Sequence, residues 1–251
     1  MMPSLPPELL DLIVDHSCDQ PTTLKACCLV SKSWVSRARR HLFVYVEFNP
    51  DYLGGSSIES WIKAFPDPLN SPAHHTRSLA ISGLTTVTAA ATHGNAWVRS
   101  FHHIVKLAVD THWQDDGEVS LIQFHGLSPT LRSLSVDRSS LPLSEAFNLI
   151  CSFPLLEDLS LRSFLPQQQC IHDPTNPPST SPKLTGSLLL QRGNHSITRR
   201  LLDLPGGLHF AKISMDCRDV CLESAVELVS RCSDTLESLY FSSSTSLQLL
   251  C

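Results

Sequence analysis

The sequence predicts an α/β protein: an N-terminal unit of three helices, followed by a right-handed solenoid with a curved parallel sheet. The first 48 residues place apolar side chains at helical spacing behind prolines and serines that can start helices. The rest of the chain repeats the pattern Leu-x-x-Leu-x-Leu at steps of 25 to 28 residues. Composition agrees with a large apolar interior, because 39 of 251 residues are leucine and only 17% are charged.

Charge and cysteine content exclude several classes of protein. The net charge of −5 and the lack of a long basic stretch argue against nucleic acid as the main partner. The N-terminus lacks the basic region of a secretory signal, and no apolar run is long enough to cross a membrane. Nine cysteines, an odd number, lie mostly in apolar runs and predict reduced thiols. We therefore expect a cytoplasmic or nuclear protein with no membrane contact.

The first predicted helix begins at Pro6 and Pro7, because the first turn of a helix needs no backbone N–H donors. Ser4 is the expected N-cap. The residues that follow form one apolar face at steps of three and four, and this face comprises Leu9, Leu12, Ile13 and His16. Additional apolar residues widen the face, so this helix needs two neighbours.

A second helix is predicted from Pro21, with Thr22 or Thr23 as its N-cap. Ser31 or Ser33 ends it and starts a third helix, which carries Trp34 and a basic last turn. The alternating residues 43–48 then predict a strand.

Three short helices can bury little surface area among themselves, yet the three predicted here are rich in apolar residues. Two explanations follow: part of the apolar surface is covered by a partner protein, or it packs against the rest of the chain. Composition favours neither.

Three ordered blocks in this region resemble a known family. Residues 5–14 resemble the opening of an F-box, residues 24–34 its middle and residues 38–43 its end. The domain assigned to this resemblance spans residues 1–48. The arrangement is similar to that of many F-box proteins of mushroom-forming fungi.

The resemblance implies a partner. An F-box docks on a Skp-family adaptor, which joins it to a cullin–RING ubiquitin ligase. The family's adaptor contacts correspond here to Leu5, Pro6, Leu9, Ile13, Leu29, Val30 and Trp34. Trp34 would either lock the helices together or face the partner. Residues 16–20 lack the leucine that the family often has there, so the end of the first helix is expected to bind less tightly.

The repeated pattern begins at residues 76, 104, 131, 156, 184, 210 and 236, and the fifth copy is one residue longer. Its spacing falls in the leucine-rich-repeat range of about 20–29 residues, with helical patterns between the copies. We assign residues 49–75 to a linker with a helix that leads into the repeats, and residues 76–251 to about seven degenerate leucine-rich repeats. Residues 166–183 are expected to be a proline-rich loop, and the region to be incomplete at its C-terminus. The alternative is an irregular α/β domain with fortuitous leucine spacing.

No motif of a hydrolase, a phosphate-binding loop or a metalloprotease is present, so we predict no catalytic residue and no cofactor. Cys217 and Cys221 have no histidine at metal-ligand spacing, which predicts no metal site. The adjacent pairs His74–His75 and His102–His103 are expected to point in opposite directions and not to chelate.

These observations together predict an adaptor and not an enzyme. The helices would bind a Skp-type protein, and the repeats would present an unknown protein substrate for ubiquitin transfer by other subunits. The alternative is a non-ligase interaction or scaffold protein that uses the F-box as an anchoring helix unit.

Overall fold

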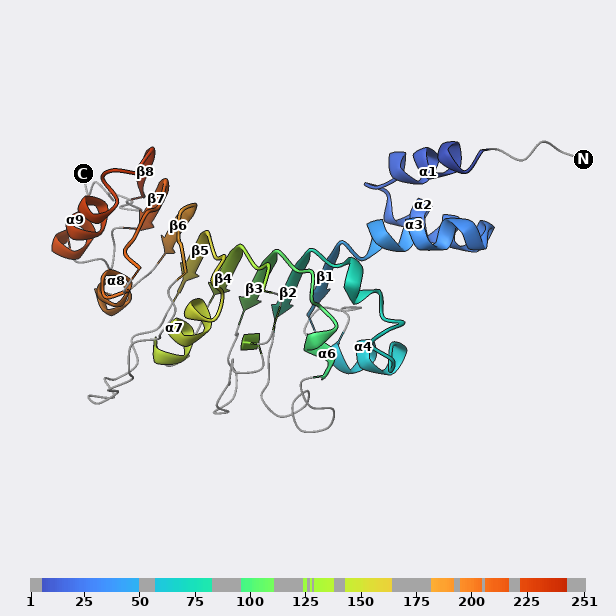
Figure 1. The fold of residues 1–251 in the computed structure, drawn as a ribbon, viewed down its shortest axis with the longest axis horizontal. Coiled ribbons are helices and arrows are strands. Elements are labelled where there is room, and N and C mark those ends of the chain that lie inside the picture. The colour runs from blue at the N-terminus through green and yellow to red at the C-terminus, as the bar shows by residue number, and fades with distance from the viewer. Residues whose placement is uncertain are drawn as a thin grey trace, which may run out of the picture.

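The computed structural model describes residues 6–49, 57–82, 96–110, 124–125, 127, 129–137, 143–163, 182–191, 195–204, 206–216 and 222–242. Within them the protein is α/β, with eight parallel strands in one sheet. Three helices precede the sheet and lie beyond its first strand (Figure 1).

The three N-terminal helices are α1 (Pro7–His16), α2 (Pro21–Val30) and α3 (Lys32–Leu42). They enclose a small core that is separate from the core of the sheet. Its buried members are Val14, Leu24, Cys27 and Ala38, and Cys28, Trp34 and Leu42 pack against them partly buried. The helical unit therefore has an interior of its own, and the sheet does not supply it.

The helix starts follow the predictions in part. Ser31 ends α2 and caps α3, since its hydroxyl accepts a hydrogen bond from the backbone N–H of Ser33. The prediction of a threonine N-cap for α2 is wrong, because Gln20 holds that position and the Thr23 hydroxyl donates to the Gln20 side chain. Pro6 occupies the N-cap position of α1, and the predicted cap Ser4 lies outside the described residues.

Eight strands run side by side in chain order, and each is parallel to its neighbours. They are β1 (Tyr45–Phe48), β2 (Ser78–Ser82), β3 (Lys106–Asp110), β4 (Ser133–Asp137), β5 (Asp158–Arg162), β6 (Ser187–Gln191), β7 (Lys212–Asp216) and β8 (Ser238–Ser242). The seven strands predicted from the repeated pattern are confirmed. The strand predicted at 43–48 is also present, and it pairs with β2 as the first strand of the sheet.

The register explains why the leucine spacing matters. Leu79, Leu107, Leu134 and Leu159 lie opposite one another on successive strands, and all four are buried. Residues two apart on a strand point to the same face, so the second apolar position of each copy forms a parallel buried row. These leucines share one core with residues of the helices, such as Ile150 and Leu201.

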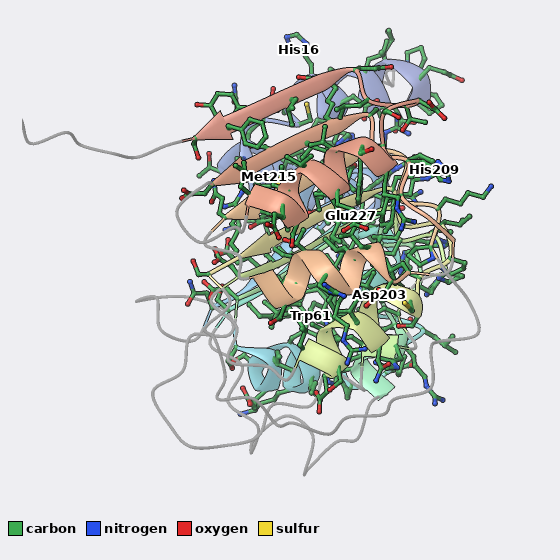
Figure 2. The ribbon with its side chains drawn as sticks, turned by 90° about the vertical axis from the view of Figure 1, so that its left-hand side faces the viewer. His16, Trp61, Asp203, His209, Met215 and Glu227 are labelled. Carbon is green, nitrogen blue, oxygen red and sulfur yellow. The ribbon has the colours of Figure 1, made fainter. Side chains whose placement is uncertain are left out.

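Helices follow several strands and lie along one face of the sheet (Figures 1 and 2). They are α4 (Ile58–Ala64), α6 (Ala96–Arg99), α7 (Leu143–Cys151), α8 (His195–Leu202) and α9 (Leu222–Arg231), while the short 3-10 helix η1 (Pro72–His75) directly precedes β2. The helical patterns expected between the copies of the repeat thus correspond to helices in this part of the chain. The helical pattern expected between the second and third copies, at residues 119–124, lies almost wholly outside the described residues.

The extra residue of the fifth copy is absorbed just before β6. Leu184 has a left-handed backbone, with φ of 40°. The Asp158 carboxylate then accepts hydrogen bonds from the backbone N–H and the hydroxyl of Ser187, both at 2.7 Å. A side chain at Gly186 would collide with that carboxylate. Glycine is therefore needed here because the chain passes too close to Asp158 for a Cβ atom.

Two further predictions, the proline-rich loop and the incomplete C-terminal end, concern residues that lie mostly outside the described part of the chain. Of the expected loop 166–183 only Pro182 and Lys183 are described, and residues 243–251 are outside the description. None of the helices among the described residues is long and apolar enough to cross a bilayer.

Candidate functional site: exposed apolar residues on the N-terminal helices

Helices α1 and α2 expose large apolar side chains in spite of having a core of their own. The exposed residues are Leu9 (46%), Leu12 (62%), Ile13 (45%), Leu29 (90%) and Val30 (69%), and we call them the apolar set. Leu29 contrasts with Leu24 on the same helix, which is only 1% exposed. Single exposed leucines are common on protein surfaces, but five large apolar residues on two short helices make this region the candidate site.

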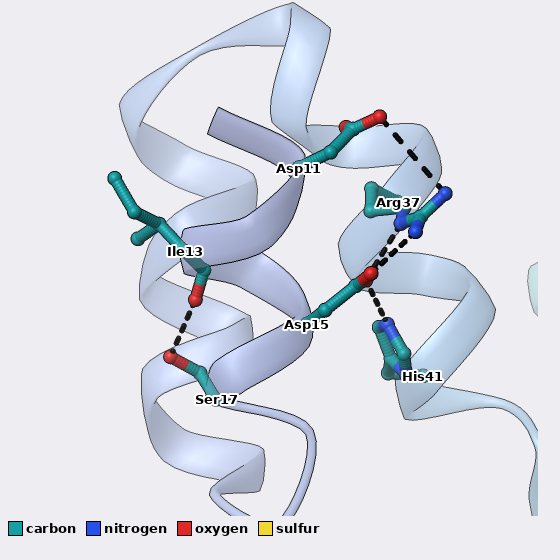
Figure 3. Close-up of polar contacts among 6 residues, drawn as sticks. All are labelled: Asp11, Ile13, Asp15, Ser17, Arg37 and His41. Atoms are coloured by element: carbon teal, nitrogen blue, oxygen red, sulfur yellow. Dashed lines mark hydrogen bonds and ion pairs between the residues drawn. The ribbon is translucent and has the colours of Figure 1, made fainter. Parts of the chain in front are cut away.

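A polar cluster fixes α1 against α3. The Asp15 carboxylate accepts hydrogen bonds from Arg37 Nε at 2.6 Å, from Arg37 Nη2, and from His41 Nε2 at 2.7 Å (Figure 3). Asp11 lies 3.9 Å from Arg37 Nη1. Arg37 and His41 follow Asp15 by 22 and 26 residues, so these bonds join the first helix to the third.

The pKa shifts in this cluster show which of its groups are charged. Hydrogen bonds from Arg37 and then His41 hold the pKa of Asp15 well below its usual range. The same bond to Asp15 raises the pKa of Arg37. Both groups are therefore charged at neutral pH, and the pair is a charge-assisted bidentate contact.

The cluster also sets the direction of the apolar residues of α1. At about 100° per residue, the midpoint between Leu9 and Ile13 lies about 160° around the helix from the midpoint between Asp11 and Asp15. Figure 3 shows Ile13 on the side of α1 away from Asp15 and Arg37. Because the carboxylates face α3, Leu9 and Ile13 must face away from it.

The predicted contact residues are placed in three ways. Leu9, Ile13, Leu29 and Val30 are exposed, as is Pro6 at the start of α1. Trp34 is partly buried and packs against the core of the three helices. Leu5 lies outside the described residues.

Leu12 is an exposed member of the apolar set that the family resemblance did not include. Its signal was present in the sequence, because Leu12 follows Leu9 by three residues on the apolar face of the first predicted helix. Its 62% exposure is larger than that of Leu9 or Ile13.

Groups capable of chemistry are otherwise sparse in the described part of the chain. No cluster of three His, Cys, Asp or Glu side chains suited to a metal occurs among the residues searched. Burial raises the pKa of the Cys151 thiol to about 11 and also raises that of Cys232, so neither is a thiolate at neutral pH.

The prediction that paired histidines point in opposite directions is wrong. The rings of His74 and His75 have centroids 3.9 Å apart, and those of His102 and His103 are 4.2 Å apart. Neither pair lies in a strand or a regular α-helix: the first is in η1 and the second in the turn before β3.

Comparison with known proteins adds no assignment. The chain matches none of the protein-family models, and none of the curated proteins matches it significantly.

Proposed function

We propose that this protein is an F-box substrate-recognition adaptor of a Skp–cullin–F-box ubiquitin ligase. The observation that carries the proposal is the apolar set, which stays exposed although the three helices have a separate core. The F-box resemblance of residues 1–48 supplies the kind of partner, a Skp-family adaptor that covers apolar helix faces.

The energetics are of the right size for such an interface. Burying a leucine or valine side chain fully is worth about 1.5–3 kcal/mol. Leu29 is 90% exposed, so nearly all of that free energy is available to a partner. With Leu9, Leu12, Ile13 and Val30 contributing smaller shares, the set offers several kcal/mol before the costs of association.

The sheet supports the second half of the proposal, a leucine-rich-repeat solenoid. Its strands follow one another in chain order, at the period of the leucine pattern, and Leu79, Leu107, Leu134, Leu159 and Leu188 are buried on β2 to β6. Parallel strands joined through helices on one face favour right-handed connections. The other face of the sheet carries short side chains such as Ala80, Ser135 and Ser160, and we propose that the repeats present a protein substrate.

The proposed mechanism is proximity and involves no catalytic residue of this chain. A bound target lysine would be held near ubiquitin carried by other subunits, in the cytoplasm or the nucleus. Holding two reactants together raises their effective concentration.

Co-purification with a Skp-family adaptor tests the proposal. The double variant Leu9→Asp/Leu29→Asp should abolish capture, because two carboxylates would be buried without partners. Leu69→Asp is the matched control, since Leu69 is 89% exposed but lies in the segment before η1. The Leu69→Asp variant should capture the adaptor to the same extent as the wild-type chain does.

Two results contradict the proposal. If wild-type protein recovers no adaptor, the ligase function is wrong, and self-association of the chain would favour an anchoring or scaffold role. If the control loses capture together with the double variant, the binding does not depend on the apolar set.

A further inference from the structure

Three basic segments meet at the amino-terminal edge of the sheet. The end of α3 leads into β1, η1 leads into β2, and the turn holding His103 leads into β3. Because these strands are parallel neighbours, the segments before them share one edge. Figure 1 shows α3 passing directly into this end of β1. We call the basic residues there the junction cluster: Arg39, Arg40, His74, His75, Arg77 and His103.

The members interact across the three segments. Burial lowers the pKa of His75, and the nearby charges of His74, Arg40 and Arg39 lower it further. Burial likewise lowers the pKa of His103, with added effects from His102, Arg77 and His74. The histidines of η1 therefore lie within electrostatic reach of α3 on one side and of the turn before β3 on the other.

A hydrogen bond fixes part of this arrangement. Arg77 Nη1 donates to the backbone oxygen of His103 at 3.2 Å, which ties the start of β2 to the start of β3. His74 contributes its ring nitrogen Nδ1 to a contact of 2.6 Å with the backbone oxygen of Ser71. The cluster is thus held by backbone contacts and contains no internal counter-charge.

The positive charge of the cluster is not compensated in the described part of the chain. Ion pairs there involve Arg37, Arg132, Arg231 and His41, but not Arg39, Arg40 or Arg77. All three of these arginines are exposed. Like charges held together raise the electrostatic free energy of the folded chain, and an anionic ligand would lower it.

We propose that the junction cluster binds a short acidic segment of a partner protein. Guanidinium groups pair with carboxylates through two parallel hydrogen bonds, and three of them on one edge can hold a run of Asp or Glu side chains. None of its members belongs to the apolar set, so the site is distinct from the proposed adaptor surface and does not depend on it.

Size and surrounding charge favour an acidic protein segment over nucleic acid. Three adjacent strands span about 10 Å, which along one nucleic-acid strand with a spacing of about 3.4 Å covers only about three phosphates. The chain as a whole carries a charge of −5. Asp110 and Asp137 lie side by side at the opposite ends of β3 and β4 and would repel a longer polyanion crossing the sheet.

Fluorescence anisotropy of a labelled oligoglutamate peptide with the full-length chain at low salt tests the site. Arg39→Gln/Arg40→Gln should weaken binding about tenfold or more, because it removes two charge-assisted contacts. Arg199→Gln/Arg200→Gln is the matched control, since these adjacent arginines lie on α8, far along the chain. It should bind like the wild type.

Several outcomes overturn the inference. They are no binding of the peptide by the wild-type chain, an equal loss in both double variants, or tighter binding of a single-stranded DNA of equal charge. Thermal unfolding verifies that the variants fold, and Arg77→Gln provides a second test from the sheet side should the α3 variant unfold. Capture of a Skp-family adaptor by Arg39→Gln/Arg40→Gln should be unchanged, so failure of this site and failure of the proposed ligase function are distinguishable.

Discussion

Truncating two leucines of α2 should have opposite consequences for folding and binding. Leu24 is 1% exposed in the core of the three helices, and Leu29 is 90% exposed on the same helix. Leu24→Ala should destabilise the helical unit by about 2–5 kcal/mol through lost burial and the cavity that remains. Leu29→Ala removes a side chain that buries about a tenth of its surface, so it should cost less than about 0.3 kcal/mol.

Binding should show the reverse order. Leu29 can contribute most of about 1.5–3 kcal/mol to a partner interface, which corresponds to a rise in Kd of about tenfold or more for Leu29→Ala. Titration calorimetry with a purified Skp-family adaptor measures the Kd, and urea denaturation followed by circular dichroism measures stability.

The reasoning fails if Leu29→Ala shifts the unfolding midpoint as much as Leu24→Ala does, because Leu29 would then be buried by the chain itself. It also fails if Leu29→Ala leaves the adaptor Kd unchanged.

Three further changes test other parts of the structure. Asp15→Asn should lower the melting temperature at pH 7, because it weakens the contact with Arg37. The depressed pKa of Asp15 means that its ionised form stabilises the fold fully above about pH 4. The difference in melting temperature between the variant and the wild type should therefore shrink as the pH falls below that value. Leu134→Ala, at 0% exposure in the middle of the sheet, should cost about 2–5 kcal/mol in urea denaturation. Gly186→Ala should cost about 1–3 kcal/mol, since the new methyl group collides with the Asp158 carboxylate, and a neutral result in the same assay would contradict this.

The strands could be predicted because their signal is local and repeated. Leu134 and Val136 alternate with serines, and the same alternation returns every 25 to 28 residues. A period of two gives a strand with one buried face, and a fixed spacing puts successive strands side by side. Helix caps were harder to predict: Gln20 holds the N-cap position of α2 where a threonine was expected, because Pro21 already sets the first turn.

The apolar set could be predicted only in part. Family resemblance selected Leu9, Ile13, Leu29 and Val30, and all are exposed. It also selected Trp34, which packs partly buried against the helical core. Sequence spacing gives the face of a helix on which a residue lies, but not which neighbour covers that face.

The sequence alone determined the order of helices and strands, the leucines that fill the sheet, and the surplus of apolar residues near the N-terminus. Tertiary structure decided which of those residues remain in water, because the packing of the three helices buries Leu24 and leaves Leu29 open. It also joined Asp15 to Arg37 and gathered the arginines and histidines of the junction cluster. Such contacts link residues that are distant in the chain, and only the packing of helices and parallel strands sets the distances between them.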